Sequence, residues 1–242
     1  MSLRIAFDLD GTLADMDAAL QAEAEKLFGP EVDLRATLRG RTEGSPSSES
    51  PDPTAAMPGM RSTALAASGG IRLSTRQQRH LWARVRDIEN FWFSLKEVEP
   101  GIVRRLAEVA AANEWEVLFI TTRPSSAGQT TQLQSQRWLA ANGFALPSVY
   151  VVQGSRGRIA SALTLDAVID DRPENCLDVA TDSSARPFLV WRDTPESVPS
   201  GAARLGIDVV FSVADALTQL ESWRPHGDQQ GFLHRVKATL GI

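Results

Sequence analysis

The chain has 242 residues, enough for one large domain or for a domain that carries a smaller insertion. Its formal net charge of −5 argues against binding to nucleic-acid polymers, which require a basic face. The single cysteine, Cys176, cannot form an internal disulfide and is expected to pack in the core. No apolar stretch is long enough to span a membrane. We therefore expect a soluble cytoplasmic protein without a membrane partner; its oligomeric state cannot be read from the sequence.

Two aspartates close the first predicted strand. Leu3 to Leu9 is a short, mostly apolar run suited to a buried strand, and Asp8 and Asp10 lie at its end. Residues i and i+2 of a strand point to the same side, so these two carboxylates can converge. Gly11 then allows a sharp turn. Converging carboxylates repel each other, which favours a bound cation or a shared proton.

The next segment is predicted to be mainly helical. A helix is expected over about 18–28, with Asp15 or Asp17 as its N-cap. Residues 40–59 are rich in Ser, Pro, Gly and Thr and predict a flexible loop. A second helix begins near Ser74.

An aromatic cluster that contains Phe91 and Trp92 follows this second helix. These rings can pack helices against the rest of the protein, or one of them can line a site and stack on a planar substrate group. Composition favours packing but leaves both interpretations open.

From residue 100 onward, helices and strands alternate. A helix over 102–113 precedes a strand at 116–120, which runs into Thr121, Thr122 and Arg123. The remaining expected elements are a helix over 129–142, a strand at 148–152, a helix to about 163, strands at 165–169 and 187–191, an edge strand at 209–210 and a helix over 215–223. This alternation predicts an open, mostly parallel sheet covered on both faces.

Polar side chains follow the predicted strands where the strands end. They are the carboxylates of Asp8, Asp10, Asp170 and Asp171, the hydroxyls of Thr121 and Thr122, and the guanidinium groups of Arg123, Arg156, Arg158 and Arg172. Carboxylates gathered at one edge would repel strongly without a metal ion, and all-oxygen ligands favour Mg²⁺. His80, His226 and His234 lack the spacing of metal ligands and are expected at the surface.

Residues 1–192 resemble the haloacid dehalogenase-like (HAD) phosphohydrolases, which have four motifs in a fixed order. The same order is found here: the D-L-D-G-T stretch, the strand ending in threonine, the basic residues and the D-D pair. This resemblance implies an α/β fold: a Rossmann-like three-layer sandwich with a central, mostly parallel sheet. Residues 1–13 and 100–242 would form the core domain, with a tail at 222–242 docked or mobile. Residues 14–99 would form a small helical cap inserted after the first strand.

The resemblance also implies a role for each motif residue. Asp8 would be the nucleophile that forms an aspartyl-phosphate, and Asp10 the general acid and base. Thr121 would bind the phosphoryl oxygens, with Thr122 as the alternative, while Gly11 and Arg123 would contact the phosphate. The implied Mg²⁺ ligands are the carboxylates of Asp8, Asp170 and Asp171 and the backbone carbonyl of Asp10.

The sequence departs from the family at its third motif, which usually supplies lysine. Arg158 stands at about the right distance before Asp170, and Arg156 is the second candidate. Arginine keeps the charge but is larger and planar, so the replacement is not neutral. It can preserve activity or mark its loss.

The segments F-W-F-S-L-K-E-V-E-P-G, F-I-T-T-R-P and I-D-D-R-P resemble the 5'(3')-deoxyribonucleotidase branch, in which cap aromatics contact the base. This similarity makes Phe91 or Trp92 a candidate for base stacking. The expected function is a Mg²⁺-dependent phosphomonoesterase for a small phosphorylated metabolite, with a 5'-nucleotide as one candidate. The alternatives are a phosphatase for a sugar phosphate or other small ester, and a catalytically silent HAD-like binding protein.

Overall fold

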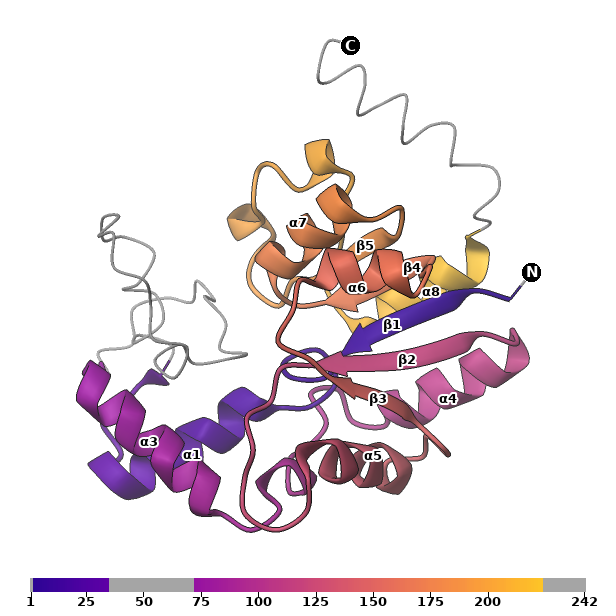
Figure 1. Ribbon diagram of the computed structural model, residues 1–242. Coiled ribbons are helices and arrows are strands. Elements are labelled where there is room, and N and C mark those ends of the chain that lie inside the picture. Colours follow the sequence, from indigo (N-terminus) through magenta and orange to yellow (C-terminus); the bar gives the residue numbers. More distant parts are fainter. Residues whose placement is uncertain (1, 35–71, 224–242) are drawn as a thin grey trace.

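The computed structural model describes residues 2–34 and 72–223 (Figure 1). The expected loop at 40–59, nearly all of the tail at 222–242, and His226 and His234 lie outside these ranges. Within them, none of the helices combines the length and the apolar character needed to cross a bilayer.

A six-stranded parallel sheet with β1 near its centre organises the described chain. Its order is β3 (Ser148–Val151), β2 (Glu116–Thr121), β1 (Arg4–Asp8), β4 (Ala167–Asp170), β5 (Arg186–Val190) and β6 (Asp208–Val210). In the parallel register, Phe7 pairs with Phe119 on one side and with Ile169 on the other. All carboxyl ends therefore lie at one edge. The chain places β2 and β3 on one side of β1 and then crosses over to place β4, β5 and β6 on the other side. Such a switch point is where parallel α/β sheets bind ligands.

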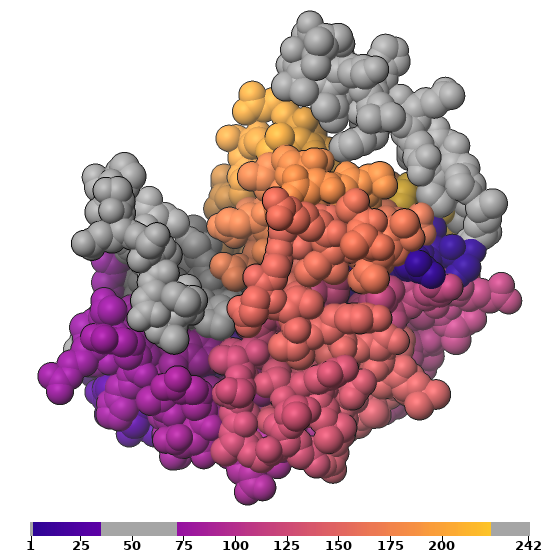
Figure 2. All heavy atoms as spheres, in the orientation of Figure 1, coloured from indigo at the N-terminus to yellow at the C-terminus, as the bar shows by residue number. Residues whose placement is uncertain are grey.

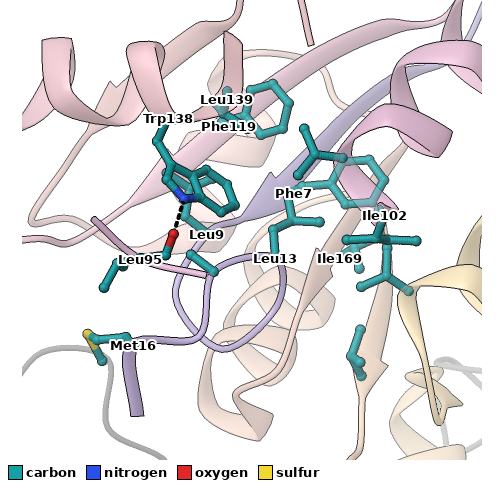
Figure 3. Packing of buried hydrophobic residues seen from close by; sticks show 14 of the residues in the cluster. Phe7, Leu9, Leu13, Met16, Leu95, Ile102, Phe119, Trp138, Leu139 and Ile169 are labelled. Atoms are coloured by element: carbon teal, nitrogen blue, oxygen red, sulfur yellow. Dashed lines mark hydrogen bonds between the residues drawn. The ribbon is translucent and has the colours of Figure 1, made fainter. Parts of the chain in front are cut away.

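Helices cover both faces of this sheet, so the predicted three-layer α/β architecture is confirmed. Ile5 and Phe7 share a buried cluster with α4 (Ile102–Ala112), α5 (Thr131–Ala141) and α8 (Val213–Ser222). Ala6 points the other way and packs with α6 (Arg156–Ala162) and α7 (Pro173–Asp182). Alternate residues of one strand thus serve two layers, as the period of a strand requires. Figure 3 shows the larger cluster, in which the Trp138 indole donates to the Leu95 carbonyl at 2.7 Å.

The helices α1 (Met16–Phe28) and α3 (Thr75–Asp87) lie beyond the carboxyl ends of the central strands (Figure 1). Asp15 caps α1 by accepting a bond from the Ala18 amide, and Ser74 forms a capping box with Gln77 at the start of α3. In the space-filling view, the violet residues of α3 join the rose residues around α5 in one continuous surface (Figure 2). These helices occupy the region where the resemblance implies a cap, and the boundary of such a domain remains a prediction.

The end of α3 is tied to the loop that follows β2. The Ala127 amide donates to the Arg86 carbonyl at 2.7 Å, and the Asn90 amide donates to the Ala127 carbonyl at 2.8 Å. The Asn90 side chain then accepts from the Gln129 amide at 3.0 Å. Three hydrogen bonds therefore join the end of α3 and the residues just after it to the loop that follows β2.

The helices α6 and α7 approach each other closely at Gly157. A Cβ atom on Gly157 would lie 2.1 Å from the Asp178 carbonyl oxygen, so only glycine fits there. The Gly157 amide also donates to the Asp178 carboxylate at 3.2 Å. The helix α7 was not predicted from the sequence, although Pro173 in its first turn is a recognised start signal.

Candidate active site

Three carboxylates gather where β1 and β4 end. Asp8 closes β1, while Asp170 closes β4 and Asp171 follows it. One oxygen from each lies within 4.8 Å of the others, and all three side chains are buried. The neighbouring parallel strands bring these three positions together, as predicted, whereas the Asp10 carboxylate, which was expected to join them, bonds to Arg123 instead. Three buried oxygen donors of this kind fit a hard divalent cation such as Mg²⁺.

The electrostatics of this cluster favour binding of a cation. Burial and the nearby Asp170 carboxylate raise the pKa of Asp8 well above its ordinary value, although the Arg156 guanidinium opposes the shift. Burial and the adjacent Asp171 raise the pKa of Asp170 to about 6. The ionised carboxylates are thus destabilised by each other and by loss of water. A divalent cation would remove that repulsion.

Hydrogen bonds orient the two carboxylates at the end of β4. The Arg172 amide donates to Asp170 Oδ1 at 2.9 Å, and the Asn175 side-chain amide donates to Asp170 Oδ2 at 2.8 Å. The Thr12 hydroxyl donates to Asp171 Oδ1 at 3.2 Å. The turn after β1 is therefore linked directly to the acids of β4.

Arg156 supplies the positive charge beside the nucleophile candidate. Its Nη2 lies 2.9 Å from Asp8 Oδ1 and 3.2 Å from Thr122 Oγ1, and its Nε lies 3.7 Å from Asp170 Oδ2. The side chain is 5% exposed, and its Nη1 has no hydrogen-bond acceptor among the described residues. A buried guanidinium with an unused donor suits an anionic ligand held next to Asp8.

Arg158 does not occupy this position, which corrects the sequence-based choice between the two arginines. Its side chain is 84% exposed and lies 3.9 Å from Asp182 on the surface. Because α6 begins at Arg156, a residue two positions further points about 200° away around the helix axis. The second candidate of the sequence analysis, Arg156, is the arginine beside the carboxylates.

A second buried arginine holds Asp10. Arg123 donates through Nη2 to Asp10 Oδ1 at 2.7 Å and through Nε to Asp10 Oδ2 at 2.9 Å. The Thr121 hydroxyl donates to Asp10 Oδ2 at 3.0 Å. Arg123 and Thr121 were expected to contact phosphate, and in the structure both instead hold Asp10. Thr122, through its contact with Arg156, is then the hydroxyl linked to the Asp8 cluster.

The turn at Gly11 is fixed by an arginine that the sequence analysis missed. Gly11 has a φ of 86°, which favours glycine, and its amide donates to the Ala14 carbonyl at 2.8 Å. Arg192 donates to the carbonyls of Gly11 and Thr12 and pairs with Glu99 at 2.8 Å. The available signal was its place just after the fifth strand, at the edge where the other site residues lie.

Phe91 and Trp92 lie in the core, which removes the structural basis for base stacking by either ring. They are 3% and 0% exposed, and their rings meet edge-to-face with centroids 5.0 Å apart. The Trp92 indole donates to the Pro124 carbonyl at 2.9 Å. The packing interpretation of this aromatic cluster is therefore the correct one.

Solved structures share this architecture, whereas no family model and no curated protein matches the chain. A Thermotoga maritima protein assigned as a beta-phosphoglucomutase aligns over 92% of this chain and 100% of its own, with 18% identity and a TM-score of 0.51. A Clostridium acetobutylicum protein described as a phosphatase aligns over 92% and 100%, with 12% identity and a TM-score of 0.55. A haloacid dehalogenase-like hydrolase of Streptococcus pneumoniae aligns over 90% and 98%, with 15% identity and a TM-score of 0.50.

The chain shares their fold. At these identities the likeness concerns architecture alone, and it agrees with the expected Rossmann-like arrangement of a central parallel sheet between helices. None of these three names is that of a nucleotidase, so the deoxyribonucleotidase branch gains no support from them.

Proposed function

We propose that the chain is a Mg²⁺-dependent HAD-like phosphomonoester hydrolase that forms an aspartyl-phosphate on Asp8. The observation that carries this proposal is the buried Asp8 carboxylate, which lies close to the acids Asp170 and Asp171 and pairs with the Arg156 guanidinium at 2.9 Å. A carboxylate so placed has within reach both acids that could bind a cation and a guanidinium that could bind an anion. The fold shared with proteins named as phosphatases and HAD-like hydrolases supports the same activity.

The metal site of this proposal uses residues that already lie close together. Asp8, Asp170 and Asp171 would hold Mg²⁺, with the Asp10 backbone carbonyl as the further ligand that the HAD resemblance implies. When bound, the ion would neutralise negative charge on the phosphoryl oxygens. Arg156 would donate its unused Nη1 to the same group, and the Thr122 hydroxyl would lie beside it.

The chemical steps follow from the positions of the two aspartates. An Asp8 carboxylate oxygen attacks phosphorus while the bond to the leaving oxygen breaks, and protonated Asp10 gives its proton to that oxygen. The now ionised Asp10 then takes a proton from water, whose oxygen attacks phosphorus and releases phosphate from Asp8. Both aspartates end as they began.

For the substrate we favour a sugar phosphate or another small phosphate ester over a nucleotide. The nucleotide interpretation depended on Phe91 or Trp92 stacking on a base, and both rings are buried. One structural neighbour is assigned as a beta-phosphoglucomutase, whose name indicates a sugar phosphate. A panel of sugar phosphates and 5'-nucleotides, scored by released phosphate, separates the two classes.

The deciding experiment is hydrolysis of 4-nitrophenyl phosphate with and without Mg²⁺. Asp8→Asn should abolish turnover, and the wild type should form a beryllium fluoride adduct on Asp8. Asp182→Asn is a matched control, because this acid lies on the surface beside Arg158. Retained activity in Asp8→Asn would refute the mechanism. If the wild type with Mg²⁺ hydrolyses no ester of the panel, the protein is the catalytically silent binding protein instead.

A further inference from the structure

Asp10 and Arg123 form a buried pair that is separate from the cluster around Asp8. Asp10 is 5% exposed and Arg123 is 2% exposed. Both Asp10 oxygens accept hydrogen bonds from Arg123 at 2.7–3.0 Å. Asp10 Oδ2 also accepts one from the Thr121 hydroxyl at 3.0 Å. The bidentate contact with a planar guanidinium fixes the plane of the carboxyl group as well as its position.

Arg123 is itself held from the side away from Asp10. Its Nη1 donates to Ser135 Oγ at 2.9 Å, and this hydroxyl donates in turn to the Thr131 carbonyl at 2.8 Å. Its guanidinium carbon lies 5.0 Å from the centre of the Trp92 ring, within the range of a cation–π contact. These contacts on both sides keep Arg123 from swinging toward a phosphoryl group on Asp8.

Among the described residues, the two buried arginines therefore pair with different aspartates, Arg156 with Asp8 and Arg123 with Asp10. Arg156 faces Asp8 and retains an unused donor, whereas all three nitrogens of the Arg123 guanidinium donate to Asp10 or Ser135. The first arrangement suits ligand binding. The second suits the orientation of a neighbouring side chain.

We propose that Arg123 is a positioning residue that holds the Asp10 carboxyl group in place for its two proton transfers. This inference rests on the proposed function, in which Asp10 is the general acid and base. Proton transfer requires a heavy-atom separation of about 2.6–3.2 Å, and a misplacement of about 1 Å can cost about 100-fold in rate. Arg123 keeps the Asp10 side chain from rotating without itself touching the substrate.

The test is a double-mutant cycle of Asp10→Asn and Arg123→Met, assayed by steady-state hydrolysis of 4-nitrophenyl phosphate and of the best alkyl phosphate from the panel. Arg123→Met should lower kcat on the alkyl phosphate about 100-fold, with KM changed by less than about threefold, since transition-state geometry is lost rather than binding. The double variant should be no slower than Asp10→Asn alone, because Arg123 acts through Asp10. Multiplying losses, or an unchanged kcat in Arg123→Met, would overturn the inference.

Milder variants keep the test valid if Arg123→Met does not fold. Arg123→Lys keeps the charge but not the fork and should recover part of kcat, and Ser135→Ala removes only the far anchor and should lower kcat several-fold at constant KM. If both variants raised KM and left kcat unchanged, the inference would be overturned. If Asp10→Asn keeps full activity, the proposed function fails with it. If Asp10→Asn is inactive while the Arg123 variants are not, only the positioning role fails.

Discussion

Replacing Arg156 by methionine tests the electrostatic design of the site. The change removes the guanidinium 2.9 Å from Asp8 Oδ1 and the unused Nη1 donor, while most of the aliphatic volume remains. Loss of one preorganised donor at a site of developing charge typically costs about 100- to 1000-fold in kcat, and we expect a loss in that range. The variant also leaves the crowded carboxylates without their buried counter-charge. Breaking a buried ion pair costs about 3–5 kcal/mol, so the metal-free variant should unfold at a lower temperature.

Arg158→Met is the matched control for this experiment. It makes the same chemical change two residues away, at a side chain that is 84% exposed. We expect its kcat to stay within about twofold and its stability within about 0.5 kcal/mol of the wild type, as for most surface substitutions. Both variants are assayed by 4-nitrophenyl phosphate hydrolysis at saturating Mg²⁺ and by thermal melting with and without Mg²⁺.

One outcome would refute the assignment of Arg156. If Arg158→Met lost activity and Arg156→Met retained it, the catalytic cation would be Arg158, as its spacing before Asp170 indicates. Arg156→Lys provides a further check, because lysine restores the charge but not the planar geometry. Its kcat should lie between those of Arg156→Met and the wild type.

Three further outcomes are expected. The pKa of Asp170 is raised from 3.8 to about 6, so protonation of this group contributes stability below pH 4 that is lost as the pH rises through about 6; Mg²⁺ should therefore raise the melting temperature more at pH 7.5 than at pH 5, and an equal rise at both would contradict this. Gly157→Ala should cost about 2 kcal/mol or more in urea unfolding, because its Cβ would meet the Asp178 carbonyl, whereas Gly154→Ala has open space and should cost much less. Burial raises the pKa of the Cys176 thiol, so iodoacetamide should label it at pH 8 only after the protein unfolds; rapid labelling of the folded protein would show that the thiol is accessible.

The sheet and the carboxylate cluster were predictable because both depend on local patterns. Apolar runs fix the strands, and the parallel arrangement that alternating helices impose brings the ends of β1 and β4 together. The polar residues directly after those runs, Asp8, Asp170 and Asp171, therefore meet without any knowledge of side-chain packing. The helix over Pro173–Asp182 was not predicted, although Pro173 in its first turn is a helix start signal.

What the sequence did not provide was the direction in which side chains point. Arg156 and Arg158 are equivalent by charge, and only the start of α6 decides which one faces the carboxylates. Phe91 and Trp92 have the same composition whether buried or lining a site, and burial depends on tertiary packing. The partner of Arg123 depends on a contact across 113 positions of the chain, which no local pattern encodes.

The close approach of α6 and α7 has a practical consequence for studies of the reaction. Arg156 precedes Gly157, and α7 begins directly after the Asp170–Asp171–Arg172 segment, so packing at Gly157 fixes where the Arg156 backbone lies relative to the acids. Neutral replacements of the aspartates should therefore leave the backbone of Arg156 in place. An inactive variant such as Asp8→Asn should then keep the backbone of the site and allow crystallisation with the intact ester bound.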